Sequence, residues 1–215
     1  MPNSSQANNS DFENDLTLWP IFEFEFPLYK DKLTGNFTVQ PIITNNISEL
    51  NPLQLRSIVN YHPKDNLEFS LAYDFNKAYL GNSDFEEQRI FEQLTYTKSL
   101  KDLEFENRFR VEQRFINEND AAVRLRYRLR VSHPINSKKD LHAIVRNELH
   151  FFANSTPGLP AGFYENRFFV GLEKEFNKFV SWEGGYQLSA RARPSPRRDL
   201  LRHSIITQFS FKLPY

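Results

Sequence analysis

The stretch that decides the fold runs from Phe105 to Val131 and reads FENRFRVEQRFINENDAAVRLRYRLRV. Every second residue from Phe105 to Phe115 is apolar or uncharged, and the same holds from Val123 to Val131. Most of the residues between them are Arg or Glu. A period of two is that of a β-strand, whose side chains point alternately to the two faces of a sheet. The stretch therefore predicts two neighbouring strands with one apolar face and one ionic face.

The ionic face continues on later strands and forms what we call the charged ladder. We expect glutamates on one strand to lie opposite arginines on the next, where opposite charges stabilise each other. The predicted members of the ladder are Glu104, Glu106, Arg108, Arg110, Glu112, Arg114, Arg124, Arg126, Arg128, Arg130, Arg146, Glu148, Glu165 and Arg167. Two roles stay open: the ladder braces a narrow interior, or it lines a pore that favours small polar or anionic solutes.

Alternating segments recur along the chain, and none has the period of a helix. They predict eleven strands, at residues 16–28, 36–44, 53–61, 67–75, 87–98, 102–115, 121–132, 140–152, 163–176, 179–193 and 200–213. Short turns such as HPKDN and FNKF alternate with longer loops such as NSTPGLPAG and RPSPRRD, with INEND as a short exception. Tight turns at one end and longer loops at the other are typical of outer-membrane barrels.

The composition narrows the class of protein. Lys and Arg total 27 and Asp and Glu total 27, a balance that argues against a general nucleic-acid-binding protein. The absence of cysteine excludes disulfides, thiolate metal sites and thiol nucleophiles. The mean hydropathy is −0.60, and no window holds the ~18 apolar residues of a membrane helix. The polar first fifteen residues lack the pattern of a secretory signal, and we expect such a signal to have been removed.

The alternation alone fits a soluble β-sandwich or barrel, a binding protein with its apolar face buried, as well as a membrane barrel. Closing about 10–12 strands with apolar residues inward would leave a lumen wider than side chains fill. Strands of about 9–14 residues suit a tilted crossing of a bilayer. An almost continuous ionic face suits a wet interior. We therefore predict an all-β fold, a transmembrane antiparallel up-and-down barrel with a charged interior and a Phe-rich, lipid-facing exterior.

The number of strands is a separate question. Bacterial single-chain barrels have even strand numbers, so the eleven segments favour twelve strands over ten. The polar tail at residues 1–15 then forms one more short strand or threads the lumen, and residues 16–215 form the barrel domain.

Several motifs together resemble a known family. They are Trp19 in the first strand, the turns YKDKLTGNF and YHPKDNLEF, the central ENRFRVEQRF and RLRYRLRV, and then RNELHFF and ENRFFVGLEKEFNKF. The chain from Asp15 to Tyr215 resembles the domain of unknown function 2490, a bacterial family regarded as outer-membrane β-barrels. The resemblance implies a barrel fold and a place in the bacterial outer membrane. It implies no activity and assigns no functional residues.

Partners are predicted from the two ends of the barrel. In QFSFKLPY, the residues Phe209, Phe211, Leu213 and Tyr215 share one phase and look like the C-terminal signal of the outer-membrane insertion machinery. The basic residues Arg191, Arg193, Arg197 and Arg198 cluster near a long loop, where they could meet the phosphates of lipopolysaccharide. The lipid bilayer is the remaining partner, and no nucleic acid is expected.

A lipid-modifying hydrolase is the competing function. It would need a Ser nucleophile and a His base within hydrogen-bond reach. His142, His150, Ser189, Ser204 and Ser210 share the inward phase, whereas His203 precedes Ser204 and faces the opposite side. His142 and His150 lie too far apart along one strand to share a metal without other ligands. We expect no catalysis, no metal and no cofactor.

Overall fold

The computed structural model describes residues 12–30, 32–78, 85–117, 121–192 and 199–214. All the regular structure in these ranges is β-strand. The strands are β1 (Phe12–Tyr29), β2 (Leu33–Thr44), β3 (Glu49–Lys64), β4 (Leu67–Lys77), β5 (Glu86–Leu100), β6 (Leu103–Ile116), β7 (Ala122–Pro134), β8 (Leu141–Phe152), β9 (Gly162–Asn177), β10 (Val180–Arg191) and β11 (Asp199–Lys212). Within the described part of the chain, no helix is long and apolar enough to cross a membrane.

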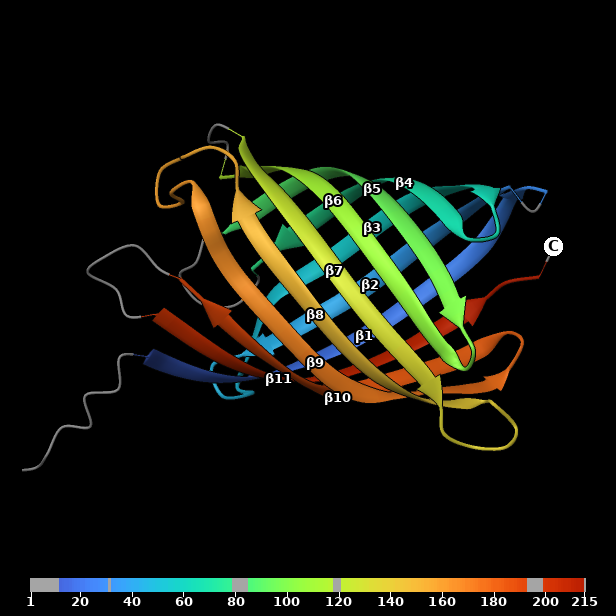
Figure 1. Cartoon of the computed structure of the whole chain (residues 1–215). Coiled ribbons are helices and arrows are strands. Elements are labelled where there is room, and N and C mark those ends of the chain that lie inside the picture. Colours follow the sequence, from blue (N-terminus) through green and yellow to red (C-terminus); the bar gives the residue numbers. More distant parts are fainter. Residues whose placement is uncertain (1–11, 31, 79–84, 118–120, 193–198, 215) are drawn as a thin grey trace, which may run out of the picture.

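The strands form one closed barrel in which each strand pairs with its neighbours in sequence (Figure 1). The all-β barrel is therefore confirmed, but the expected twelve strands and fully antiparallel closure are not found among the described residues. Each hairpin reverses the chain direction, so the first and last of eleven strands run the same way. β1 consequently pairs with β11 in parallel. β1 already begins at Phe12, within the predicted tail, and residues 1–11 lie outside the described ranges.

The parallel seam between β1 and β11 is continuous, from Phe12 opposite Asp199 to Glu25 opposite Lys212. On its inner face the Thr17 hydroxyl donates a hydrogen bond of 2.8 Å to Ser204 Oγ. On its outer face aromatic rings stack across the seam, with the centroids of Phe24 and Phe211 5.3 Å apart. The closing pair thus has the same inside and outside as the rest of the barrel.

The two ends of the barrel differ, as the sequence predicts. At the long-connection rim, on the left in Figure 1, the fully described connections are residues 45–48 and 153–161, and β4, β6 and β10 end there. At the short-turn rim the fully described connections are residues 65–66, 101–102, 135–140 and 178–179. At the latter rim Lys139 Nζ lies 2.8 Å from Asp102 Oδ1, and this hydrogen bond and the ammonium charge lower the pKa of Asp102.

The outer face of the barrel is largely apolar. Every strand exposes at least one large hydrophobic side chain, and β4 exposes them at alternate positions, as Phe69, Leu71 and Tyr73 show. Polar side chains fill the interior instead, so the usual order of a water-soluble protein is inverted. The interior is therefore where recognition chemistry must be sought.

Candidate functional site

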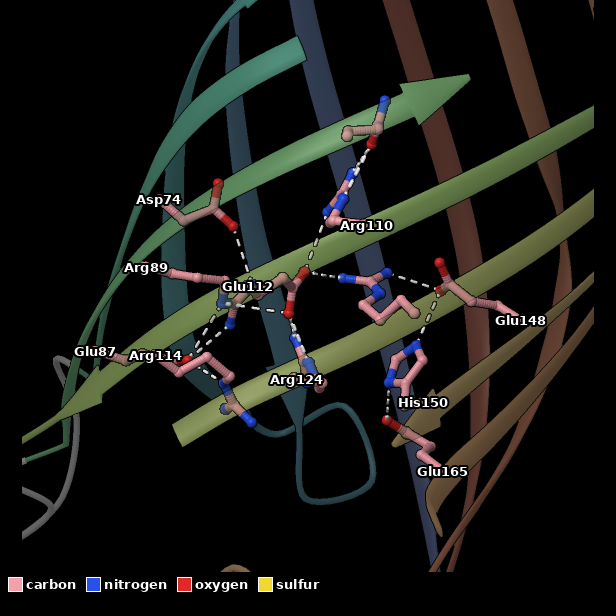
Figure 2. Close-up of polar contacts among 12 residues, drawn as sticks. Asp74, Glu87, Arg89, Arg110, Glu112, Arg114, Arg124, Glu148, His150 and Glu165 are labelled. Atoms are coloured by element: carbon pink, nitrogen blue, oxygen red, sulfur yellow. Dashed lines mark hydrogen bonds and ion pairs between the residues drawn. The ribbon is translucent and has the colours of Figure 1, made fainter. Parts of the chain in front are cut away.

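Glu112 on β6 is the centre of the interior charge network (Figure 2). Its side chain is fully buried and contacts four arginines from three strands. Arg124 contacts it through Nη2 and through Nε, the latter at 2.6 Å. The nearest nitrogens of the others lie at 2.7 Å for Arg126, 3.3 Å for Arg110 and 3.9 Å for Arg89. One negative charge is thus shared among four positive ones.

Four other buried carboxylates repeat this arrangement. Asp74 contacts Arg56 and Arg89, Glu87 contacts Arg89 and Arg114, Glu148 contacts Arg108 and Arg126, and Glu165 contacts Arg167 and Arg191. We call these five acids and their arginines the ionic belt, which extends around the inner wall from β3 to β10. Although some arginines are shared, the five acids contact nine arginines among the described residues, so the belt carries excess positive charge.

Some ion pairs follow the expected directly opposite pattern, as Asp74 does with Arg56 and Arg89, but others do not. In the β6–β7 register Arg108 lies opposite Arg128, and Arg110 lies opposite Arg126. Like charges directly across a strand pair are unfavourable. The long side chains avoid this by reaching diagonally, as Arg126 does to Glu112 and Arg128 does to Glu106. The expectation of opposite charges face to face was therefore wrong at these positions, because a shared glutamate lies one step along the strand.

His150 joins two acids of the belt and is fully buried. Its Nε2 lies 3.1 Å from Glu148 Oε2, and its Nδ1 lies 3.2 Å from Glu165 Oε2. This ring connects the Glu112 half of the belt to the Arg191 end, and it leaves no face open to a reactant.

The wall formed by β11, β1 and β2 differs from the belt. Trp19, Ile21, Ile42 and Ile206 point inward there, and they pack with Ile144 and Phe169 in one cluster. We call the first four residues the neutral wall. An interior that is ionic almost throughout was expected, so this is a correction: the lumen has an ionic side and an apolar side.

Inward aromatic rings also support several belt arginines and Arg146. The pairs of guanidinium carbon and ring centroid are Arg110 and Phe91 at 3.8 Å, Arg146 and Phe169 at 4.2 Å, Arg191 and Tyr164 at 5.2 Å, Arg167 and Trp19 at 5.4 Å, and Arg114 and Phe152 at 5.5 Å. Cations are stabilised over aromatic faces. Sequence reasoning missed these rings. All except Tyr164 share the strand phase of inward-facing polar or charged residues on the same strand and could have been found by it.

Two cavities divide the lumen along its axis. The basic chamber, about 710 Å³, opens at the long-connection rim and is lined by many arginines, with Glu87 and Glu148 as its lining acids. The acidic chamber, about 790 Å³, opens at the short-turn rim. Its acidic lining comprises Glu23, Glu25, Asp65, Glu68, Glu104, Glu106, Glu173, Glu175 and Glu183. Both chambers share Arg56, Arg108, Arg110, Arg128 and Arg146, which we call the arginine waist.

The predicted ladder residues all lie on the inner wall, in the belt, the waist or the acidic chamber. The predicted lipid-binding cluster is placed differently. Arg191 donates to Glu165 inside the barrel and lines the basic chamber, so its guanidinium does not face an outer lipid. Arg193, Arg197 and Arg198 lie outside the described residues.

The serines and histidines considered for catalysis are not brought together. Ser204 bonds Thr17, Ser189 accepts from Gln187, and His203 faces outward, where its Nδ1 lies 2.5 Å from the Tyr186 hydroxyl. No hydrogen bond in the described ranges joins a serine Oγ to a histidine ring. Nor do the described residues gather three or more His, Asp or Glu side chains in an arrangement suited to a metal ion.

The family model described as protein of unknown function, DUF2490, matches residues 16–199. The chain belongs to this family. Among solved structures, the NanC porin has a similar fold, with a TM-score of 0.58 and 18% sequence identity over 89% of this chain and 91% of that chain. At this identity the likeness concerns the fold, which is porin-like. Comparison with curated proteins gives no match.

Proposed function

We propose that this protein is a β-barrel of the bacterial outer membrane that acts as a narrow conduit favouring small anionic solutes. The observation that carries the proposal is the meeting of two lumen chambers at a shared arginine waist. A solute that passes from one chamber to the other must pass these guanidiniums. Positive groups at a constriction attract anions and repel cations.

The location is supported by the outer surface and by the fold. Exposed Phe, Leu, Val and Tyr side chains cover the outside, and closure leaves no unpaired strand edge in the described barrel. In hydrocarbon every backbone polar group needs such a partner. With short turns in the periplasm, as in bacterial barrels, the basic chamber faces the cell exterior. Lipopolysaccharide and the insertion machinery are then the proposed envelope partners.

A selectivity measurement tests the conduit. The full chain is reconstituted in planar bilayers under a tenfold KCl gradient, and we expect discrete conductance steps with a reversal potential of the anion-preferring sign. Arg128→Gln removes one waist charge and should move the reversal potential toward zero. Lys138→Gln, in the 135–140 turn, removes a positive charge away from the waist and should leave it unchanged.

Two results would count against the conduit. Cation preference in the unaltered protein would contradict the role given to the waist. A barrel that is folded, as judged by its heat-dependent gel mobility, but never conducts would instead favour bracing, the second candidate function. Bracing is supported by the ionic belt itself, which joins the strands from β3 to β10 through buried ion pairs.

A further inference from the structure

Three arginines gather at the outer end of the basic chamber. Arg167 on β9 and Arg202 on β11 lie in one row across the sheet, since both are registered with Ser189 of β10. Arg191 shares Glu165 with Arg167. All three line the chamber. We call Arg167, Arg191 and Arg202 the arginine triad.

The carboxylates of the described residues do not fully neutralise the triad. Among the described residues two carboxylates contact it: Glu165, at 2.9 Å from Arg167 and 3.3 Å from Arg191, and Asp15, at 3.2 Å from Arg202. Three positive charges against two negative charges leave one positive charge facing the chamber. Glu165 is also bound by His150, which further divides its charge. The site therefore matches a monoanion better than a dianion.

Several donors near the triad have no partner among the described residues. Trp19 Nε1, Arg167 Nε and Arg191 Nε are buried and make no hydrogen bond within this part of the chain. Buried donors are nearly always paired in proteins, because leaving one unmade is unfavourable. An acceptor oxygen that reaches them from the chamber through a small side-chain movement would satisfy them. A carboxylate carries two such oxygens and pairs well with guanidinium groups.

The neutral wall begins where the triad ends. Trp19 is 7% exposed, and its ring lies 5.4 Å from the Arg167 guanidinium carbon. Ile21, Ile42 and Ile206 continue the lining from there. A ligand whose charged end meets the triad thus has its remaining atoms against apolar side chains. Burial of each methylene on such a surface favours binding.

We propose that the basic chamber binds amphipathic monocarboxylates, with the carboxylate on the arginine triad and the apolar body along the neutral wall. The inference rests on the proposed function, because it names the class of anion that the chamber takes. A purely ionic site would not discriminate between acetate and a longer acid. A site with an apolar wall beside the cation does.

Trp19 provides a direct probe of the chamber. The chain has two tryptophans, and the other, Trp182, lies on the outer face, where its Nε1 donates to Thr207. The Trp182→Phe protein in phosphatidylcholine nanodiscs therefore reports on Trp19 alone. Titration with hexanoate should give a saturable change of emission, with half-saturation at least tenfold lower than for acetate. Hexanol should give no saturable change.

Matched variants assign the two halves of the site. Arg167→Gln should raise the half-saturation concentration for hexanoate at least fivefold. Lys212→Gln, in the acidic chamber, should leave it unchanged. Ile42→Thr, which keeps every charge, should weaken hexanoate binding and leave acetate binding unchanged. The Ile42→Thr variant also keeps the test valid if Arg167→Gln does not fold.

The proposal is overturned if hexanoate and acetate bind alike, if hexanol binds as well as hexanoate, or if no titration saturates. Its failure is separable from failure of the conduit. Saturable hexanoate binding in a barrel that never conducts would keep the monocarboxylate site and reject the conduit. Anion-selective conductance steps without any preference for hexanoate would keep the conduit and reject the monocarboxylate site.

Discussion

At the scale of single residues, Glu112 decides whether the interior charges are tolerable. Four guanidiniums approach one fully buried carboxylate, and the neighbouring arginines lie opposite one another across β6 and β7. Without this negative charge, the same side chains would repel each other in a site of low polarity. Breaking a buried ion pair by removing one partner costs about 3–5 kcal/mol, because the remaining charge stays buried.

Glu112→Gln keeps the shape of the side chain and removes its charge. We expect it to lower the free energy of unfolding by about 3 kcal/mol or more, measured by urea unfolding in phosphatidylcholine vesicles. Glu175→Gln is the control, because Glu175 is exposed at the acidic chamber and its change should have little effect. Equal stability of the Glu112→Gln and unaltered proteins would refute the central role of this carboxylate.

Single residues also show what can and what cannot be predicted from the sequence. Strand phase alone is enough to place Arg108 or Glu148 on the inner face. It does not identify their partners, because a long guanidinium side chain reaches diagonal neighbours as easily as opposite ones. Strand phase also could not predict that Arg191 contacts Glu165 inside the barrel, because this contact depends on the register of β9 against β10.

At the scale of elements, a glycine pair lies at the contact between β9 and β10. Gly171 and Gly185 are directly opposite in the register. A Cβ on Gly185 would lie 2.3 Å from the Val170 carbonyl oxygen and 2.7 Å from the Phe169 ring. The missing side chains thus leave room for Phe169, which is fully buried and supports Arg146 of the waist. The shape of the waist therefore depends on two positions without side chains.

Gly185→Ala should destabilise the barrel by about 1–3 kcal/mol, since its methyl group meets backbone that cannot move alone. Gly184→Ala is the matched comparison on the same strand. Its methyl would meet the Trp182 ring, a side chain that can rotate away, and the loss should be smaller. Urea unfolding of both variants under the same conditions gives the ranking, and the reverse order would contradict this account of the β9–β10 contact.

Elements were the most predictable level. A period of two over long segments gave all eleven strands, with limits that differ by a few residues, because alternation persists for the length of each strand. The alternation of short and long connections can also be read from the sequence, but residues 45–48 are an exception, because β3 begins at Glu49 and shortens the loop expected there. The neutral wall was not predicted. Trp19 and Ile21 point to the same side of β1 as Glu23, and that side was interpreted as ionic because of its charged residues.

At the scale of the whole molecule, the odd number of strands determines the closure. The parity rule for bacterial barrels favoured twelve strands, whereas the described residues form eleven with β1 and β11 in parallel. This closure brings Trp19 of β1 beside Ile206 of β11 and so creates the neutral wall. A different closing pair would move the apolar side of the lumen away from the arginine triad. The chambers, the waist and the binding proposal all depend on this seam.

A disulfide across the seam tests that closure most directly. The chain has no cysteine, so Thr17→Cys with Ser204→Cys introduces a single pair, at positions whose hydroxyl oxygens are 2.8 Å apart. Oxidation of the folded protein should link them almost completely, seen as a changed gel mobility after heating that a reductant reverses. Thr17→Cys with Ser210→Cys should not link, because Ser210 lies opposite Glu23 instead of Thr17. Absence of the first link, or equal formation of both, would contradict an eleven-strand barrel closed in parallel.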